Sequence, residues 1–327
     1  MSRPRASISV DLDNLWAYQR THGDPEWEQR GSYLHIAVPR MLDALDEAGC
    51  KATVFIVGAD AARADASQLL RQIAKRGHEV GNHSFEHACW LHRSDAAVIG
   101  EELQRADEAI RAATGLEPVG FRGPGFVWSA ALLTAVVDRG YRFDASTLPS
   151  FIGPLARRRL LRTAHFTAAE RALRADLFGS FADGTRPNRP YRWRLPDGRR
   201  LLEIPVTTVP FARVPFHQSY IVYLAAFSRR LALGYFRTAL AACRVDGVEP
   251  SILLHPLDWL DGEEVPELRF FPGMQLSVTR KVALLQDSLR LLKQSFAIET
   301  IGAQALRLNG SSALPERDAQ ASRGGNT

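Results

Sequence analysis

Residues 7–16, SISVDLDNLW, decide the fold, because a strand-like apolar run ends there in two aspartates, Asp11 and Asp13. Apolar residues, two of them β-branched, alternate with serines over 6–10, which predicts a strand. Side chains two residues apart on a strand share a face, so both carboxylates point into one site. Two carboxylates that close raise each other's pKa unless a cation intervenes, and burying them unpaired is costly. On its own, the stretch also fits two aspartates that cap the next loop.

The chain beyond this stretch alternates between strand-like and helix-like segments. Strand character occurs at 51–58, 78–83, 118–125, 141–146, 249–259 and 296–302, and helical periodicity at 38–49, 66–77, 96–115, 129–140 and 280–295. This alternation predicts parallel βα units. We therefore expect an α/β fold in one domain over residues 1–310, and a disordered polar tail over 311–327.

Residues 147–248 interrupt this alternation and are predicted to be an insertion. The part over 147–216 is rich in Arg, Pro and Phe, and we expect a loop with a hairpin around the PDG turn at 196–198. Residues 219–244 are predicted to form one long apolar helix. Two central arginines keep any apolar run below the ~20 residues of a bilayer span, so a core helix is favoured, and an interfacial helix remains open.

The composition is that of a globular protein, with 46% hydrophobic and 24% charged residues. The net charge of +5 is uneven, because 156–200 holds twelve arginines against four acidic residues. This segment is either a solvated surface or a site for phosphate, on a ligand or on lipid headgroups. We predict no nucleic-acid partner, since no DNA- or RNA-binding motif accompanies the charge.

The expected location is the cytoplasm. The basic first residues, MSRPRA, are not followed by the apolar stretch of a signal peptide. Three scattered cysteines form no disulfide framework.

A second motif is HSFEH, in which His83 and His87 stand four residues apart. On a helical turn this spacing puts both imidazoles on one face, which suits a single metal ion. The order differs from H-E-x-x-H, so a zincin site is excluded.

Two further stretches place polar residues after strand-like runs. These are FRGPGF with Arg122 and ILLHPLDW with His255. Alone, they fit a surface turn and a satisfied core histidine. All four motifs, however, follow predicted strands, whose carboxyl ends converge on one face of a (β/α) barrel.

Together these motifs resemble the polysaccharide deacetylase family, also called the NodB-homology group or carbohydrate esterase family four. VDLDN is similar to the D-x-D form of its first motif, found in the branch with lipid-linked sugar deformylases; HSFEH, the R-x-P loop and ILLHP match three others. The fourth motif is weak, because YRFDAS has Asp144 without the usual D-W. The resemblance covers 6–150 and 249–302, and it implies an irregular (β/α)7-type barrel with an inserted basic and apolar segment.

The resemblance also implies a metal site. Asp13, His83 and His87 would hold a divalent ion, with Zn²⁺ expected, and leave positions open for water and a substrate carbonyl.

The resemblance implies catalytic roles as well. Asp11 would be the base that takes a proton from water, Arg122 would orient Asp11, and His255 would protonate the leaving amine. Substrate contacts are predicted for the neighbouring residues Pro124, Trp16 and Trp259.

The resulting expectation is a metal-dependent hydrolase that removes an acetyl or formyl group from the nitrogen of an amino sugar. The sugar is expected to be linked to a lipid or a nucleotide, and the protein to lie in the cytoplasm at the inner membrane surface. Two alternatives remain open: an allantoinase-like enzyme that cleaves a small cyclic amide, and a barrel that binds carbohydrate or lipid headgroups without catalysis. The oligomeric state is not predicted.

Overall fold

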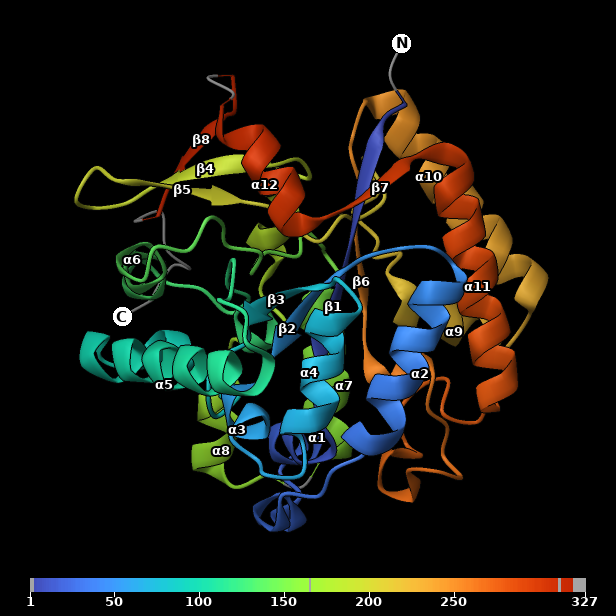
Figure 1. Cartoon of the computed structure of the whole chain (residues 1–327), viewed down its shortest axis with the longest axis horizontal. Coiled ribbons are helices and arrows are strands. Elements are labelled where there is room, and N and C mark those ends of the chain that lie inside the picture. The colour runs from blue at the N-terminus through green and yellow to red at the C-terminus, as the bar shows by residue number, and fades with distance from the viewer. Residues whose placement is uncertain (1–2, 165, 311–312, 320–327) are drawn as a thin grey trace.

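A parallel sheet crosses the centre of the computed structural model, which describes residues 3–164, 166–310 and 313–319 (Figure 1). The strand order is β3-β2-β1-β6, and β7 also pairs with β1. Every one of these pairings is parallel, as the sequence predicted. The strands are β1 (Arg5–Leu12), β2 (Thr53–Ile56), β3 (Glu79–Asn82), β6 (Ser251–Leu254) and β7 (Ala297–Thr300).

The backbone contacts continue past β3 through single bridges. Asn82 pairs with Phe121, Phe121 with Asp144, and Asp144 with Glu203, all in parallel. The predicted strands over 118–125 and 141–146 are therefore reduced to one bridging residue each. Further on, the amide of Thr207 donates to the carbonyl of Ser251 in β6 (3.1 Å). This path returns to the starting sheet and is compatible with the expected irregular (β/α)7-type barrel.

Amphipathic helices pack against the sheet and build the main core. In Figure 1, α5 and α6 lie on the left, and α2 and α11 on the right. The core joins apolar side chains of the central strand, such as Val10, to those of the flanking helices, such as Leu42 and Leu285. The helices outside the insertion are α1 (Leu15–His22), α2 (Leu34–Glu47), α3 (Gly58–Ala61), α4 (Ser67–Lys75), α5 (Ala96–Thr114), α6 (Ala130–Asp138), α11 (Val278–Ser295) and α12 (Ile301–Asn309). Short 3₁₀ turns lie at η1 (Pro25–Gln29), η2 (Leu91–Arg93), η3 (Pro124–Phe126), η4 (Phe181–Thr185), η5 (Pro256–Asp258) and η6 (Pro266–Leu268).

The insertion is more helical than predicted. The single helix expected over 219–244 is wrong: it is divided into α9 (Gln218–Ala225) and α10 (Arg229–Asp246). Ser228 has extended backbone, and its side chain accepts from the amide of Leu231, so it starts a new helix. The predicted loop contains α7 (Gly153–Thr163) and α8 (Ala168–Leu173). Among the described residues, no helix has the length and apolarity to cross a membrane.

The expected hairpin is present as β4 (Tyr191–Arg194) and β5 (Arg200–Glu203). A third strand, β8 (Glu316–Asp318), adds to it in parallel, so the prediction of a disordered tail is wrong for 313–319. Backbone bonds to β4 and an ion pair between Arg194 and Asp318 (2.6 Å) hold this polar strand in place. The rest of the predicted tail, 311–312 and 320–327, lies outside the described residues.

Most arginines of the 156–200 segment bind acceptors of this chain. Arg174 donates to the carbonyls of Thr21 and Arg20, and Arg186 pairs with Asp183. Ion pairs also involve Arg189, Arg194, Arg199 and Arg200. The charge of the segment therefore serves largely to attach the insertion to the fold.

Candidate active site

Asp11 and Asp13 stand at the carboxyl end of β1, the central strand of the sheet. Asp11 lies opposite Phe55 of β2, and both aspartates are buried. The next residue, Asn14, starts α1 by accepting from the amide of Leu15. Asn14, and not an aspartate, therefore caps the N-terminus of α1, so both carboxylates are available to the site.

His83 and His87 follow β3, as predicted, but they lie in a loop and not on a helical turn. Ser84 and His87 have φ angles of 61° and 48°, in the left-handed region. The amide of Ser84 donates to Oδ1 of Asn82 (2.7 Å), and the amide of His87 donates to Oγ of Ser84 (3.1 Å). These bonds, rather than helical periodicity, bring the two imidazole rings to a centroid distance of 5.0 Å.

Asp13, His83 and His87 form a group with the geometry of a metal site. One ligand atom from each lies within 4.8 Å of the others. Oδ1 of Asp13 is 3.3 Å from Nε2 of His83 and 3.0 Å from Nε2 of His87. Nδ1 of His83 is bound to the carbonyl of Arg122 (2.6 Å), which leaves Nε2 for the group.

Whether a metal ion fits this group can be judged from the buried polar atoms that lack hydrogen-bond partners. Apart from their contacts within this group, Oδ1 of Asp13 and both ring nitrogens of His87 are buried without a hydrogen-bond partner among the described residues. Burial raises the pKa of Asp13, but His87 and His83 together hold that pKa well below its usual value. A carboxylate beside two imidazoles, with unpaired buried atoms, is a donor set that suits a divalent cation.

Arg122 fixes the other aspartate. Its Nη1 lies 2.6 Å from Oδ1 of Asp11 and 2.9 Å from Oγ of Ser9, and its Nε donates to the carbonyl of Ala145 (2.9 Å). The guanidinium also stacks over Phe55 at 4.3 Å. These contacts orient Arg122. The weak fourth motif had not identified which residues would do so.

Asp144, the residue of that fourth motif, lies in a buried pair with Glu203. Its Oδ1 accepts from Oγ of Ser146 (2.6 Å). Burial raises the pKa of Asp144 and, together with the negative charge of Asp144, raises the pKa of Glu203 well above its usual value. Both raised pKa values favour a protonated carboxyl within this pair.

His255 follows β6 and faces Asp11. Its Nε2 is 3.9 Å from Oδ2 of Asp11, and its Nδ1 is 3.2 Å from Oγ of Ser219. The backbone amide of His255 donates to Oδ2 of Asp258 (2.8 Å), which closes the η5 turn. Ser219 was missed by the sequence reasoning, since nothing in the pattern of an apolar helix marks one serine as a partner of a distant histidine.

A cavity of about 440 Å³ opens beside His255. Its walls come from α7, α9 and the loop at 271–272, and they are mostly apolar and aromatic. His255, Ser219 and Asp258 line it, whereas Asp13, His83 and His87 do not. Other lining residues include Tyr18, Phe126, Arg159, His217, Tyr220 and Phe271.

The three residues predicted to contact substrate lie outside this cavity wall. Trp16 is 1% exposed and its Nε1 donates to Oδ1 of Asp60; Trp259 is 0% exposed and its Nε1 donates to the carbonyl of Ala37. Neither ring has a surface left for a substrate, so the prediction for both tryptophans is wrong. Pro124 is also buried, and Phe126, two residues later, lines the cavity instead.

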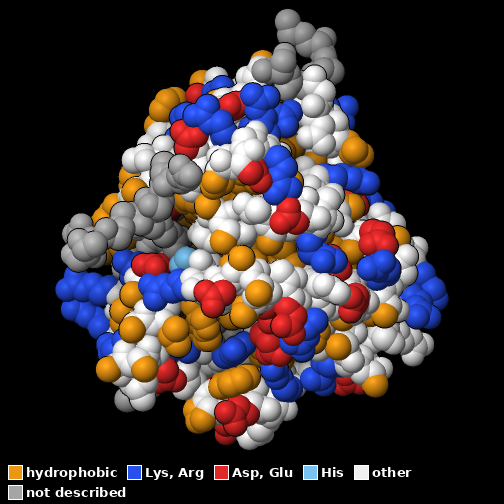
Figure 2. Space-filling model, turned by 90° about the vertical axis from the view of Figure 1, so that its left-hand side faces the viewer, with side chains coloured by type: hydrophobic (Ala, Val, Ile, Leu, Met, Phe, Trp, Pro, Cys, Tyr) orange, Lys and Arg blue, Asp and Glu red, His pale blue; other side chains and the backbone are white. Residues whose placement is uncertain are grey.

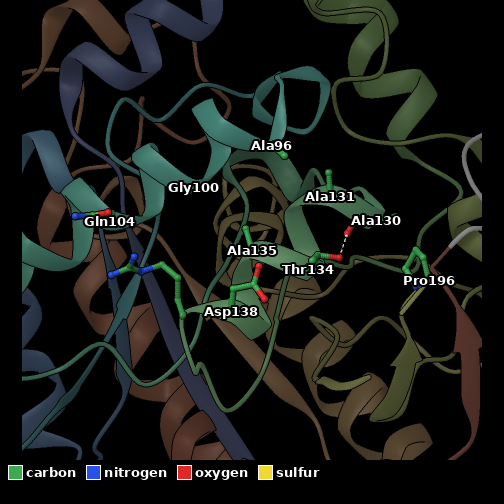
Figure 3. A pocket seen from close by; sticks show the side chains of 10 residues that line it. Ala96, Gly100, Gln104, Ala130, Ala131, Thr134, Ala135, Asp138 and Pro196 are labelled. Atoms are coloured by element: carbon green, nitrogen blue, oxygen red, sulfur yellow. Dashed lines mark hydrogen bonds between the residues drawn. The ribbon is translucent and has the colours of Figure 1, made fainter. Parts of the chain in front are cut away.

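A second hollow lies away from these residues, between α5 and α6. Small side chains line most of it (Figure 3), and Gln104, Asp138 and Arg139 also belong to its lining. The face of the molecule in Figure 2 carries basic and acidic side chains interspersed among apolar ones. The hollow is lined by none of the residues Asp11, Asp13, His83, His87 and His255.

Comparison of sequences matches part of this chain to known proteins. The model of the polysaccharide deacetylase family matches residues 31–143. The chain is 31% identical over 134 residues to a chitooligosaccharide deacetylase of Bradyrhizobium, covering 38% of this chain and 59% of that protein. It is 36% identical over 106 residues to a chitooligosaccharide deacetylase of Sinorhizobium fredii, covering 32% and 48%. The matched part thus spans about half the length of these relatives.

A solved structure matches nearly the whole chain. It is a protein of Mycobacterium smegmatis, provisionally described as a polysaccharide deacetylase, with a TM-score of 0.61 and 18% identity. The match covers 97% of this chain and 96% of that one. At this identity the likeness shows the fold alone.

Proposed function

Since the chain belongs to the polysaccharide deacetylase family, we propose that it is a metal-dependent hydrolase that removes an N-acyl group from an amino sugar. One observation carries this proposal. Arg122 holds one oxygen of Asp11, and the other oxygen faces His83 on one side (4.0 Å) and His255 on the other (3.9 Å). A fixed carboxylate between a metal-type cluster and a histidine is the arrangement that amide hydrolysis needs.

Each side chain has a separate task in this proposal. Asp11 accepts the proton of the attacking water at Oδ2, because its Oδ1 is occupied by Arg122. His255 donates a proton from Nε2 to the leaving nitrogen, and Ser219 holds the opposite ring nitrogen. The proton thus moves from the water side to the amine side over a short path, and the amide bond breaks to a carboxylic acid and a free amine.

The metal in this proposal is Zn²⁺, held by Asp13, His83 and His87. When bound, it would polarise the acyl carbonyl and lower the pKa of water. Two imidazoles and one carboxylate are a ligand set common to catalytic zinc.

We further propose that the sugar is linked to a lipid or a nucleotide, and that the acyl group is acetyl or formyl. The cavity beside His255 supports a bulky, partly apolar substrate, since its wall is mostly apolar and includes several aromatic side chains. Arg159 of α7 lines the same cavity and could face a phosphate of such a carrier. A mostly apolar wall is a poor match for a small cyclic amide, so the allantoinase-like alternative is not favoured.

The location proposed is the cytoplasm, at the inner surface of the membrane. The exposed face of α7 carries Arg158, Arg159 and Arg162 next to the apolar Leu155, which is 60% exposed. Such a mixture suits an anionic lipid surface. In a sedimentation assay, the protein should pellet with anionic vesicles and stay in the supernatant with neutral vesicles. An equal pelleted fraction with both kinds of vesicle would count against the proposal.

Hydrolysis assays test the function. The Zn²⁺-loaded protein is given N-acetyl and N-formyl amino sugars, free and linked to undecaprenyl phosphate, and the released amine is measured. Wild type should be active on at least one substrate, and H83A should be inactive. Equal inactivity of both on every substrate, with metal bound in wild type, would instead support a barrel that binds without catalysis.

A further inference from the structure

His217 has the environment of a ligand-binding residue. It lies just before α9, in the segment that the family motifs do not cover, and the residue is 6% exposed. The ring stands edge-on to Tyr220 (centroids 4.8 Å apart) and lies 5.9 Å from the ring of His255. Both histidines line the same cavity.

Nδ1 of His217 is buried without a hydrogen-bond partner among the described residues. Buried polar atoms in proteins are almost always paired, so an unpaired one needs an explanation. Another histidine of this chain shows the ordinary solution, since Nδ1 of His22 bonds to the carbonyl of Tyr18 (2.9 Å).

The charge state of His217 limits what it can bind. Burial, then the nearby His255 and Arg122, lower its pKa to about 3. The imidazole is therefore neutral at physiological pH, and a neutral ring offers one donor and one acceptor. A hydroxyl group, which also donates and accepts, complements this pair, whereas a phosphate only accepts.

The cavity lies on one side of the reaction. It adjoins His255 and Ser219 but none of the residues of the metal-type group. If His255 protonates the leaving nitrogen, as the proposed function requires, the group that fills the cavity is the amine half of the substrate and not the acyl half.

We propose that His217 determines specificity for the sugar, by exchanging hydrogen bonds with a hydroxyl of the amine half bound in the cavity beside His255. The proposal rests on the proposed function for its assignment of the two substrate halves. It adds a substrate-binding residue within the inserted segment, where no family motif lies.

Binding of the amine product tests the proposal without relying on turnover. The metal-loaded full chain is titrated with glucosamine, galactosamine and mannosamine, and with cyclohexylamine, which has the ring and the amine but no hydroxyls. Binding is followed by calorimetry, and the histidine ring nitrogens by ¹⁵N NMR. At least one amino sugar should shift the ring nitrogens of His217, and cyclohexylamine should leave them unchanged.

Three variants separate hydrogen bonding from packing. H217F should weaken binding of that amino sugar about tenfold, the effect of one lost hydrogen bond, with cyclohexylamine affinity unchanged. H217Q, which keeps a donor and an acceptor, should recover part of the loss. H78F, which removes a buried histidine far from the cavity, should bind like wild type, and melting temperatures and metal content identify any variant that misfolds.

Several outcomes overturn the proposal. These are no shift of His217 with any of the three amino sugars, an equal loss for amino sugar and cyclohexylamine in H217F, and no loss in H217F. If the protein binds amino sugar through His217 but hydrolyses no N-acyl derivative, the proposed function is rejected, whereas the sugar-binding role of His217 is supported.

Discussion

Nη1 of Arg122 lies 2.6 Å from Oδ1 of Asp11, and both side chains are buried in the centre of the fold. The pair joins the end of β1 to the residue after the Phe121 bridge, more than a hundred residues away in sequence. Because one oxygen of Asp11 is held by Arg122, the other is aimed at His83 and His255. The geometry of the whole site therefore depends on this ion pair.

Replacing Arg122 should damage both stability and activity. In R122M, Asp11 is left as a buried charge without its partner, which typically costs about 3–5 kcal/mol of folding free energy. Urea unfolding measures this loss. The double variant D11N/R122M should recover part of the stability and none of the activity, because the neutral amide at position 11 no longer needs a counter-charge. A double variant no more stable than R122M would contradict this account.

Asp13 should control metal binding without controlling the fold. D13N removes the only carboxylate of the Asp13, His83 and His87 group, and zinc content per chain, measured by elemental analysis after dialysis, should fall by at least tenfold. D65N is the matched control, since Asp65 is an exposed carboxylate paired with Arg63. Equal zinc content in D13N and D65N would exclude this site.

The sequence predicted well where the site residues lie, because each of them directly follows an apolar run. Asp13, His83 and His255 come right after β1, β3 and β6, and parallel strands bring those ends to one edge. Their catalytic and metal-binding roles remain predictions.

Features that depend on tertiary contacts were missed. The loop geometry of His87 comes from bonds to Ser84, and the partnership of Ser219 with His255 spans 36 residues. Neither leaves a periodic pattern in the sequence. The two tryptophans were wrongly predicted to contact substrate, because the sequence does not show whether an aromatic ring beside a motif faces a cavity or the core.

Ser219 should act as a positioning residue for His255. In S219A, Nδ1 of His255 loses its 3.2 Å contact, and the ring can rotate away from Asp11. We expect kcat to fall about tenfold with KM nearly unchanged, because one hydrogen bond of about 1.4 kcal/mol orients the ring. S219T keeps the hydroxyl and should restore most of kcat. A loss confined to KM would show that Ser219 contacts substrate instead.

The carboxyl pair of Asp144 and Glu203 should make stability depend on pH. Glu203 accepts hydrogen bonds from Thr147 (2.5 Å) and Trp193 (2.9 Å), while burial and Asp144 raise its pKa well above the usual value. A carboxyl with a raised pKa in the folded state favours folding below its unfolded pKa, near 4.3 for Glu, and this contribution is lost as pH rises through the folded pKa. Wild type should therefore lose stability as pH increases from about 4.3 toward that raised folded pKa.

The variant E203Q isolates this contribution. Its amide can still donate to Asp144 but has no proton to lose, so the free energy of unfolding should fall less between pH 5 and pH 8 than in wild type, by about 1.4 kcal/mol for each unit of pKa shift that lies in this window. Urea unfolding at both pH values gives the comparison. E263Q, at an acidic residue of the exposed loop after Asp261, serves as the control and should follow wild type. Parallel pH profiles for E203Q and wild type would mean that Glu203 is ionised in the folded protein and that the proton of the pair is absent.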